Sequence, residues 1–422
     1  QKALDTAGAA GGGTVYVPAG RYNLKGHLTV PTGVELRGIW DVPHHTVSDG
    51  STLMVTEGKG QENGTPFIQL QPRSGVRGLN IWHPEQTIDQ PVAYPWVVRS
   101  LGVGCWAVDL NLGNAWNGVD FGTHPSDGHV VQYLSGGFFR RGLWVSKSRT
   151  AGWVEDTQFN PHYTMRLPEG MPHPPFTGDM GGKVIAWQRA NQVGIAQGSC
   201  AEEHVRGTFV YAAYDGIAFV NDNGGPKARV IIHGSDTGSR SCYIEAGNIE
   251  GHLSQLVPRS AQAVAAYVVR PSCKREARFD NSQLWAGATS AVVEGSGKLL
   301  LSQLNTLTGP MRLAGGKVGL VGAWFSGTWA PAVAIEPGCQ SAQVVACLSG
   351  APLQVANGIG ERAFIRANSA AGYRSASGAA MSLSEDKFRL TTGFEAGQPI
   401  GPKDTVATPG GGIKSVSGMT CG

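Results

Sequence analysis

The chain has 422 residues, of which 41% are hydrophobic and only 15% charged, with 61 glycines and a formal net charge of +3 at pH 7. Glycine and proline make up about a fifth of the chain and are spread evenly, which excludes collagen and long disordered segments and suits short strands joined by tight turns. No basic run is longer than the pair Arg140-Arg141, and no apolar stretch reaches the roughly 18 residues that cross a bilayer, so we expect neither a nucleic-acid partner nor membrane insertion.

The first residues predict a cap followed by stacked strands. Residues 1–10 suit a short helix that covers the first coil, since a solenoid must cover the core that is open at its end. Residues 14–17, 27–30 and 34–37 then supply the first strands. The chain opens on Gln1 without an initiator Met, so we expect a mature or trimmed protein that is secreted, periplasmic or attached to the cell surface.

The clearest internal repeat lies between residues 282 and 357. Two strand-like pieces recur there every roughly 20–23 residues, four times, which fits one coil of three short strands and three turns. The first pieces start at Ser282, Ser302, Gly322 and Val345, and the second at Ser290, Met311, Ala332 and Leu353. Propeller blades need about 40–50 residues each. The repeat therefore favours a parallel β-helix over a propeller or an antiparallel sandwich.

The same rhythm continues upstream with looser turns. The segments that start at Asn117, Arg141 and Asp215 look like one strand on different coils. Trp106 and Trp153 begin similar segments and should lie two coils apart. Residues of the middle coils that are distant in sequence are therefore expected to become neighbours in space.

A proline-rich excursion between residues 161 and 182 breaks the repeat, and long loops on a rigid scaffold usually serve function. We predict an all-β chain in which residues 1–366 form a single-stranded right-handed parallel β-helix with an N-terminal capping helix. Residues 367–422 lose the repeat and are expected to form an irregular C-terminal capping or strapping segment.

Two segments near the start carry a family resemblance: residues 11–22, Gly-Gly-Gly-Thr-Val-Tyr-Val-Pro-Ala-Gly-Arg-Tyr, and residues 27–38, His-Leu-Thr-Val-Pro-Thr-Gly-Val-Glu-Leu-Arg-Gly. They resemble the opening coil of the pectate-lyase-like superfamily, which includes the glycosyl hydrolase family 28-related proteins and many phage depolymerases. The resemblance implies a right-handed parallel β-helix and a carbohydrate partner, but no single reaction, because the superfamily holds hydrolases, lyases, epimerases and non-catalytic spikes.

The polygalacturonase motifs of this superfamily are incomplete in the chain. Asn221-Asp222-Asn223 and Gly251-His252-Leu253 match two of them in part. The Asp-Asp and Arg-x-Lys motifs are missing from their expected order. The resemblance therefore does not imply specificity for pectin.

Carboxylates in the middle coils are the first candidate chemistry. Equivalent residues on adjacent coils lie about 4.8 Å apart, and glycosidases need two carboxyl groups about 5–5.5 Å apart for retention or about 6.5–9.5 Å apart for inversion. The candidate catalytic carboxylates are Asp120, Asp156, Asp215, Asp222 and Glu245. We favour Asp156 and Asp215, two coils apart, as acid and base of an inverting hydrolase. The alternative for each is a turn carboxylate that accepts hydrogen bonds from backbone amides.

A second candidate is the group His162, Tyr163 and Asn160, close in sequence to Arg141. A lyase needs a base for the proton next to a uronate carboxylate, and a cation that holds that carboxylate. His162 could be the base and Arg141 the cation. The alternative is that His162 and Tyr163 only shape the loop.

Aromatic residues complete the predicted site, because sugar rings stack on such side chains along a groove. The candidate substrate-binding residues are Trp82, His83, Glu85, Tyr94, Trp96, Trp116, Arg141, Trp144, Trp153 and Tyr163. About half of the tryptophans are expected to fill the interior instead. The adjacent histidines His44 and His45 are too close to chelate one metal without further ligands, so we predict no metal and no cofactor.

The preferred function is a glycoside hydrolase that cleaves a polysaccharide or oligosaccharide. A polysaccharide lyase acting on a uronate is the first alternative, and a non-catalytic glycan-binding or structural β-helix is the second. The oligomeric state stays open. Cys339 and Cys347 could bridge or could be single buried thiols.

Overall fold

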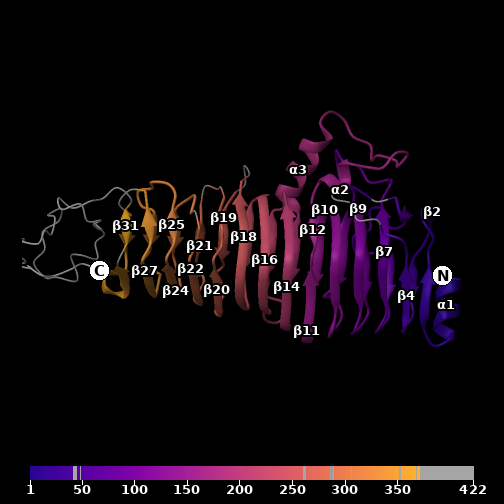
Figure 1. Cartoon of the computed structure of the whole chain (residues 1–422), viewed down its shortest axis with the longest axis horizontal. Coiled ribbons are helices and arrows are strands. Elements are labelled where there is room, and N and C mark those ends of the chain that lie inside the picture. The colour runs from indigo at the N-terminus through magenta and orange to yellow at the C-terminus, as the bar shows by residue number, and fades with distance from the viewer. Residues whose placement is uncertain are drawn as a thin grey trace, which may run out of the picture. The chain divides into compact units, whose positions relative to one another are not determined.

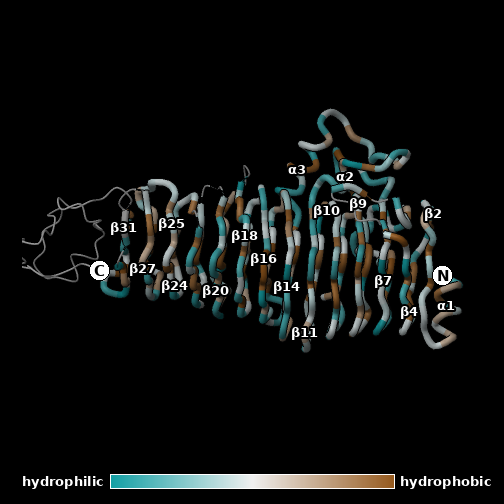
Figure 2. Tube along the Cα trace, viewed as in Figure 1, coloured by the Kyte–Doolittle hydropathy of each residue, from teal (hydrophilic) through white to brown (hydrophobic). Residues whose placement is uncertain are grey.

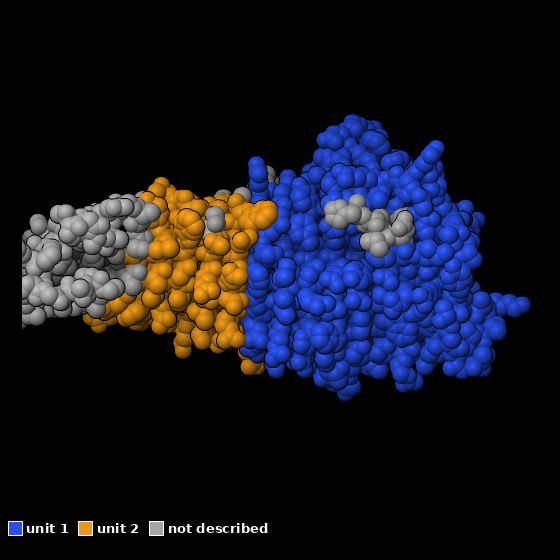
Figure 3. All heavy atoms as spheres, viewed as in Figure 1, with its two compact units in different colours: residues 1–268 blue, residues 269–422 orange. Residues whose placement is uncertain are grey.

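The computed structural model describes residues 1–40, 45–47, 49–259, 263–285, 287, 289–305, 307–350, 353–366 and 368–370. The chain divides into two compact units, residues 1–268 and 269–422 (Figure 3). Within each unit, parallel strands stack coil upon coil, so both are parallel β-helices (Figure 1). Nearly all of the predicted C-terminal cap lies outside the described residues. None of the helices in the described ranges is both long and apolar enough to traverse a lipid bilayer.

Each coil of unit 1 has three faces, which we call A, B and C in chain order. Face A holds β1 (Gly13–Tyr16), β4 (Val34–Arg37), β11 (Ser148–Glu155) and the first parts of β7 (Gly75–Trp82), β9 (Trp106–Phe121), β10 (Val130–Val145), β14 (Cys200–Tyr211), β16 (Lys227–Gly238) and β18 (Asn248–Pro258). Face B holds β2 (Gly20–Leu24), β5 (Ser51–Val55), β12 (Gln158–Phe159) and the following parts of those long strands. Face C holds β3 (Leu28–Val30), β6 (Ile68–Leu70), β8 (Trp96–Ser100), the ends of β9 and β10, β13 (Val193–Gln197), β15 (Asp215–Phe219), β17 (Arg240–Ile244) and β19 (Ala265–Val269).

The register confirms the strand equivalences expected from the sequence. On face C, Asn117 pairs with Arg141, Arg141 with Val193, and Val193 with Asp215. On face A, Val130 pairs with both Trp106 and Trp153, so the two tryptophans lie two coils apart. The helix α1 (Lys2–Ala9) lies against the first coil, where the Gln1 side chain and the Thr29 backbone exchange two hydrogen bonds of 3.0 and 2.9 Å.

The core of unit 1 is a stack of equivalent aliphatic side chains. Val119, Leu143, Ile195 and Ile217 follow one another on face C and are all fully buried. Hydrophobic and hydrophilic residues alternate along the strands, as Figure 2 shows. Each coil therefore contributes one layer of the interior and one row of outward side chains.

In six successive coils of unit 1, one left-handed residue turns the chain from face A to face B. This corner is occupied by Gly78, Asp109, Tyr133, Asp156, Gly207 and Ile232, with φ between 48° and 71°. Such a conformation favours Gly, Asn and Asp. The left-handed backbone conformation at this corner therefore accounts for an aspartate at position 156.

A column of glycines follows face C on successive coils. A Cβ on Gly118 would lie 2.3 Å from the carbonyl oxygen of Gly142, and a Cβ on Gly194 would lie 2.7 Å from that of Gly216. The next coil therefore packs too closely for any side chain. Glycine is therefore required for steric reasons at the second position of the repeated strand.

We expect Gly194→Ala to lower the free energy of unfolding by about 1–3 kcal/mol, because the new methyl group would also lie 2.7 Å from the Val210 side chain. Urea unfolding followed by circular dichroism measures the change. Gly350→Ala is the control, since a Cβ there has no neighbour within 4 Å. Equal unfolding midpoints for the two variants would contradict this packing.

Long insertions leave the coils of unit 1 between faces A and B and between faces B and C. The longest carries α2 (His162–Met165) and α3 (Met180–Asn191), which project from one side of the strands near β10 and β12 (Figure 1). Lys183 of α3 and Thr177 both donate to Asp89 of the 83–95 insertion. Ile88, Phe139 and Val184 pack together beneath them. The two insertions therefore form one wall where face B turns into face C.

Unit 2 repeats the three-faced coil with shorter turns. Its first face holds β20 (Glu276–Asp280), β22 (Lys298–Ser302), β24 (Lys317–Val321), β27 (Ser341–Val345) and, after the 3-10 turn η1 (Gly360–Arg362), β30 (Ala363–Arg366). Its second face holds β25 (Trp324–Phe325), β28 (Leu348–Ser349) and β31 (Ser369–Ala370). Its third face holds β21 (Ala291–Val293), β23 (Met311–Leu313), β26 (Val333–Ile335) and β29 (Val355–Asn357). These pairings give the late sequence repeat its structural basis.

The two cysteines that the sequence allowed to bridge both lie in the coils of unit 2. Cys339 and Cys347 are both fully buried, and no disulfide joins them. Burial raises the pKa of the Cys339 thiol, which keeps it protonated and unreactive.

Candidate functional site

Face C of unit 1 gathers more of the predicted site residues than any other part of the described chain. Five lie on its strands: Trp96, Asp120, Arg141, Trp144 and Asp215. Two more, Asp222 and Glu245, follow the carboxyl ends of β15 and β17. Because the strands are in register, these side chains come from coils that stack directly on one another.

Arg141 is the distinctive residue of face C. It is half-buried, and its guanidinium group makes no hydrogen bond or ion pair with any described residue. Burial, followed by the neighbouring charge of Arg140, lowers the pKa of Arg141, while the charges of the Glu62 and Asp120 carboxylates oppose this shift. A partly desolvated cation without a counter-ion is costly unless a ligand supplies one.

Asn117 lies beside Arg141 on the preceding coil. The two residues are in register, and strands of one sheet lie about 4.8 Å apart. Asn117 is 1% exposed, and its Oδ1 has no hydrogen-bond partner within the described structure. A buried amide oxygen of this kind normally has a partner. Asn117 was not among the residues predicted from the sequence, although it occupies the first position of the repeated strand, as Arg141 does.

Asp120 is already saturated with hydrogen bonds. Its Oδ2 accepts from Arg99 Nε at 2.5 Å and from Thr123 Oγ1 at 2.6 Å. Its Oδ1 accepts from the backbone amides of Gly122 and Thr123 at 3.0 and 2.9 Å. Asp120 is fully buried. Its carboxylate therefore holds the strand end and the Arg99 side chain, and it presents no free oxygen to a substrate.

Asp215 is neutralised in a similar way. Arg240, on the next coil, donates to both of its oxygens at 2.6 and 2.8 Å. Arg240 is itself held over the rings of Tyr214 and Tyr243, 4.5 and 3.7 Å from their centroids. Burial raises the pKa of Asp215, and the hydrogen bonds and charge of Arg240 oppose this shift. The pair is a fixed structural element with little solvent contact.

Asp222 and Glu245 are the carboxylates of face C that keep solvent contact. Asp222 accepts a hydrogen bond of 2.6 Å from Ser146 Oγ. Glu245 accepts from Tyr243 at 2.7 Å and from the backbone amide of Asn221 at 3.3 Å. The two follow strands of consecutive coils, so they lie at the same edge of face C.

Asp156 lies elsewhere. It occupies the corner between faces A and B with φ 50°, whereas Asp215 begins a strand of face C. The structure therefore does not bring together the two carboxylates that we expected to act as a pair. The sequence spacing predicts how many coils separate two residues along the axis. It does not predict on which face of its coil each residue lies.

His162 and Tyr163 belong to a separate group outside face B. The ring of His162 lies 5.2 Å from that of His45, and Tyr163 donates to Gln158 Oε1 at 3.0 Å. Burial, and then the charge of Arg166, lower the pKa of His162. The contacts of His162 within the described structure are with this group, so the structure does not join it to Arg141.

Most of the predicted aromatic subsites are covered. Trp82 is fully buried beneath the 167–172 segment, where its Nε1 donates to the Pro172 carbonyl at 3.1 Å. His83 and Tyr94 are buried and pack against each other at 4.8 Å, and burial lowers the pKa of His83 to about 4. Tyr163 is also buried. These four side chains cannot stack on a sugar, since the insertions return onto face B and enclose them.

The remaining candidates are distributed over three surfaces. Trp116 packs against Trp187 of α3 at 6.1 Å, and Glu85 lies 3.4 Å from Lys59 on the insertions. Trp153, on face A, is 42% exposed, but one side of its ring is stacked on His204 at 4.2 Å. Trp96 is 7% exposed and Trp144 is half-buried, and both lie on strands of face C.

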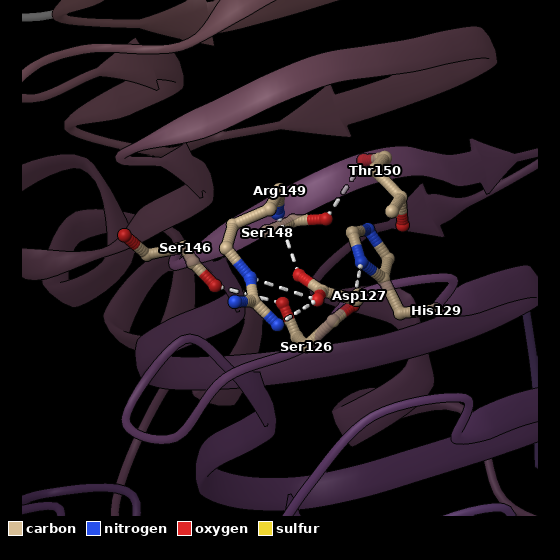
Figure 4. Close-up of polar contacts among 7 residues, drawn as sticks. All are labelled: Ser126, Asp127, His129, Ser146, Ser148, Arg149 and Thr150. Carbon is tan, nitrogen blue, oxygen red and sulfur yellow. Dashed lines mark hydrogen bonds and ion pairs between the residues drawn. The ribbon is translucent and has the colours of Figure 1, made fainter.

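A buried titratable pair lies where face C turns into face A. His129 Nε2 is 3.2 Å from Glu203 Oε1, and both side chains are fully buried. Figure 4 shows His129 beside the turn that carries Ser126, whose carbonyl accepts from His129 Nδ1 at 2.8 Å. Burial opposes protonation of His129, but Glu203 and the Ser126 carbonyl outweigh it and raise its pKa. This pair connects the coil of His129 to the coil of Glu203, and it has no access to solvent.

No group of three or more His, Cys, Asp or Glu side chains in the described ranges is arranged to hold a metal ion.

Arg99 and Arg240 were missed by the sequence prediction. Their role as counter-ions depends on register, which decides that Arg99 meets Asp120 and that Arg240 meets Asp215.

No protein-family model matches the chain, and no curated protein matches it. Solved structures similar to it include the A-module of the mannuronan C-5 epimerase AlgE6 from Azotobacter vinelandii, with 13% identity, a TM-score of 0.38, and coverage of 88% of this chain and 94% of that one. Two structures of PfbA, a surface adhesin of Streptococcus pneumoniae, have 11% and 13% identity and TM-scores of 0.31 and 0.34. They cover 87% and 86% of this chain and 88% and 94% of their own. At these identities and TM-scores the similarities assign no activity, ligand or partner to this chain.

Proposed function

We propose that unit 1 binds an acidic glycan along face C, with Arg141 as the cation that receives a uronate carboxylate. The observation that carries this proposal is the half-buried guanidinium group of Arg141, which lacks a counter-ion among the described residues. Guanidinium and carboxylate groups form two parallel hydrogen bonds, so a uronate is a fitting partner for this residue.

The neighbouring arginines of face C differ from Arg141, because they already have carboxylate partners. On face C, Arg99 is paired with Asp120 and Arg240 is paired with Asp215, so Arg141 is the guanidinium group of this face that forms no ion pair with a described residue.

Binding is better supported than cleavage. Both oxygens of Asp120 and of Asp215 are already bonded, so neither carboxylate is available as acid or base. His162, the base considered for a lyase, has its contacts with the separate group around His45. Of the three functions considered from the sequence, the geometry therefore favours the glycan-binding protein.

Glycoside hydrolysis is the second candidate, favoured by Asp222 and Glu245. They are partly solvent-accessible carboxylates at one edge of consecutive coils, an arrangement that suits an acid and a base. Hydrolysis would release new reducing ends from an acidic polysaccharide, and both Asp222→Asn and Glu245→Gln would abolish that release. A lyase would instead give unsaturated uronates that absorb ultraviolet light.

Calorimetric titration with a matched pair of ligands tests the binding proposal. We expect the full chain to bind an oligogalacturonate and to bind the corresponding neutral oligogalactose much more weakly. Affinity for the acidic ligand should fall as salt is added, because the contact is ionic. Equal affinity for both ligands, or binding that is insensitive to salt, would remove Arg141 from the centre of the site.

A further inference from the structure

The second face of unit 2 and the turn after it carry no charged side chain. Residues 281–293, 299–311, 318–335 and 337–360 contain no Asp, Glu, Lys, Arg or His. The charges of unit 2 fall instead on its first and third faces and the turns between them, as in the ion pairs of Lys298 with Glu276 and of Arg312 with Glu336. In four successive coils the same side is thus uncharged, and a partner for it should be uncharged too.

Exposed aromatic and amide side chains follow one another on this face. Gln283 pairs with Asn305 on the next coil, and Trp324 pairs with Leu348 one coil further on. Asn305 and Trp324 are brought side by side by the hydrogen bond of 2.9 Å from Trp324 N to the Leu304 carbonyl.

Trp285 joins the same row. Its Nε1 donates to Gln283 Oε1 at 3.1 Å, so the indole and the amide lie on one side of the strand. We call Gln283, Trp285, Asn305, Trp324 and Leu348 the tryptophan row. The large apolar members are strongly exposed, at 58% for Trp285, 53% for Trp324 and 53% for Leu348.

We propose that the tryptophan row is a binding site for a neutral polysaccharide chain that runs along the coils of unit 2. Indoles stack on the C–H faces of sugar rings, and amides exchange hydrogen bonds with sugar hydroxyls. One coil advances about 4.8 Å, close to the length of one sugar ring in an extended chain, so Trp285 and Trp324 contact alternate sugars with Asn305 between them.

The row differs in chemistry from the site on face C. Face C offers a guanidinium group without a counter-ion, which selects a carboxylate, whereas the row offers only indole, amide and aliphatic groups. The two amides of the row also favour a glycan over a second copy of the chain, because the core of a protein interface is mainly apolar. The two proposals therefore concern different sugars and different residues.

Calorimetric titration of the full chain with neutral hexasaccharides tests the row. The probes are the β-1,4-linked glucan, mannan and N-acetylglucosamine hexamers and the β-1,3-linked glucan hexamer. We expect at least one to bind, each of Trp285→Ala and Trp324→Ala to weaken that affinity by about tenfold, and the double variant to abolish it. Phe364→Ala is the matched control, since this 47% exposed ring lies on the first face of unit 2 and should leave affinity unchanged.

Two further measurements keep the outcomes distinct. Arg141→Ala should retain affinity for the neutral hexasaccharide, so failure of the acidic-glycan proposal would leave this one standing. Sedimentation of the wild type and of Trp324→Ala identifies the alternative occupant. The proposal is overturned if no hexasaccharide binds, if the tryptophan variants bind as well as the Phe364 control, or if they change only the oligomeric state.

Discussion

Replacing Glu203 by Ala is expected to lower the free energy of unfolding of the full chain by about 3–5 kcal/mol. Glu203 and His129 are both fully buried, and their side chains meet at 3.2 Å. Removal of the carboxylate leaves the buried Nε2 of His129 without its partner in the interior. It also removes one of the contacts between coils at the corner of faces C and A. Urea unfolding, followed by tryptophan fluorescence, measures the loss.

The adjacent residue supplies the control. Glu202 is half-exposed and its ion pair with His204, at 3.3 Å, lies on the surface of face A. Glu202→Ala should change stability by no more than about 0.5 kcal/mol, as is usual for surface pairs. If both variants unfold at the same urea concentration, the His129–Glu203 pair does not stabilise the corner.

The same pair predicts how stability depends on pH. The folded-state pKa of His129 is raised above its unfolded value near 6.5, so its stabilising contribution is fully present below about pH 6.5 and is lost as the pH rises through the folded-state value. The unfolding midpoint should therefore fall as the pH rises above neutrality. His129→Gln should remove this dependence. An unchanged pH profile in the variant would show that another group titrates.

Replacing Arg141 by Ala is expected to weaken binding of an oligogalacturonate at least about 30-fold, because loss of one partner of a desolvated charge pair costs about 2–5 kcal/mol. The guanidinium group has no other partner among the described residues, so its removal should leave the fold intact. Arg141→Lys should restore part of the affinity, since an ammonium group keeps the charge but not the paired hydrogen bonds.

Arg149 is the matched control for this experiment. It is exposed, and it already donates to Asp127 at 2.8 and 3.0 Å in the turn between faces C and A. Arg149→Ala removes one positive charge from unit 1 without touching face C. If both variants lose the same affinity, the glycan responds to overall charge and not to the position of Arg141.

The strand equivalences could be predicted because they depend only on local pattern. A repeated polar-Gly-aliphatic start identified Asn117, Arg141 and Asp215 as one position on different coils, and the register confirms it. The position of a residue around the coil is harder to predict. Asp156 follows a strand, as a catalytic carboxylate might be expected to do, yet it is the left-handed residue that turns face A into face B.

The burial of the aromatic residues could not be predicted for a different reason. Trp82 occurs at the start of an insertion, where a side chain is expected to be exposed. The distant 167–172 segment then returns over face B and encloses it with Met54 and Met171. No local pattern records which loop covers which strand. The ion-pair partners could not be predicted for the same reason, since Asp120 is neutralised by Arg99, which lies 21 residues earlier in the sequence.

A crystal structure of the chain with an oligogalacturonate tests the account of face C most directly. We predict that one uronate carboxylate lies within hydrogen-bonding distance of both terminal nitrogens of Arg141. A ligand seated over the insertions, on face A or on the tryptophan row, with Arg141 left in contact with solvent, would contradict it.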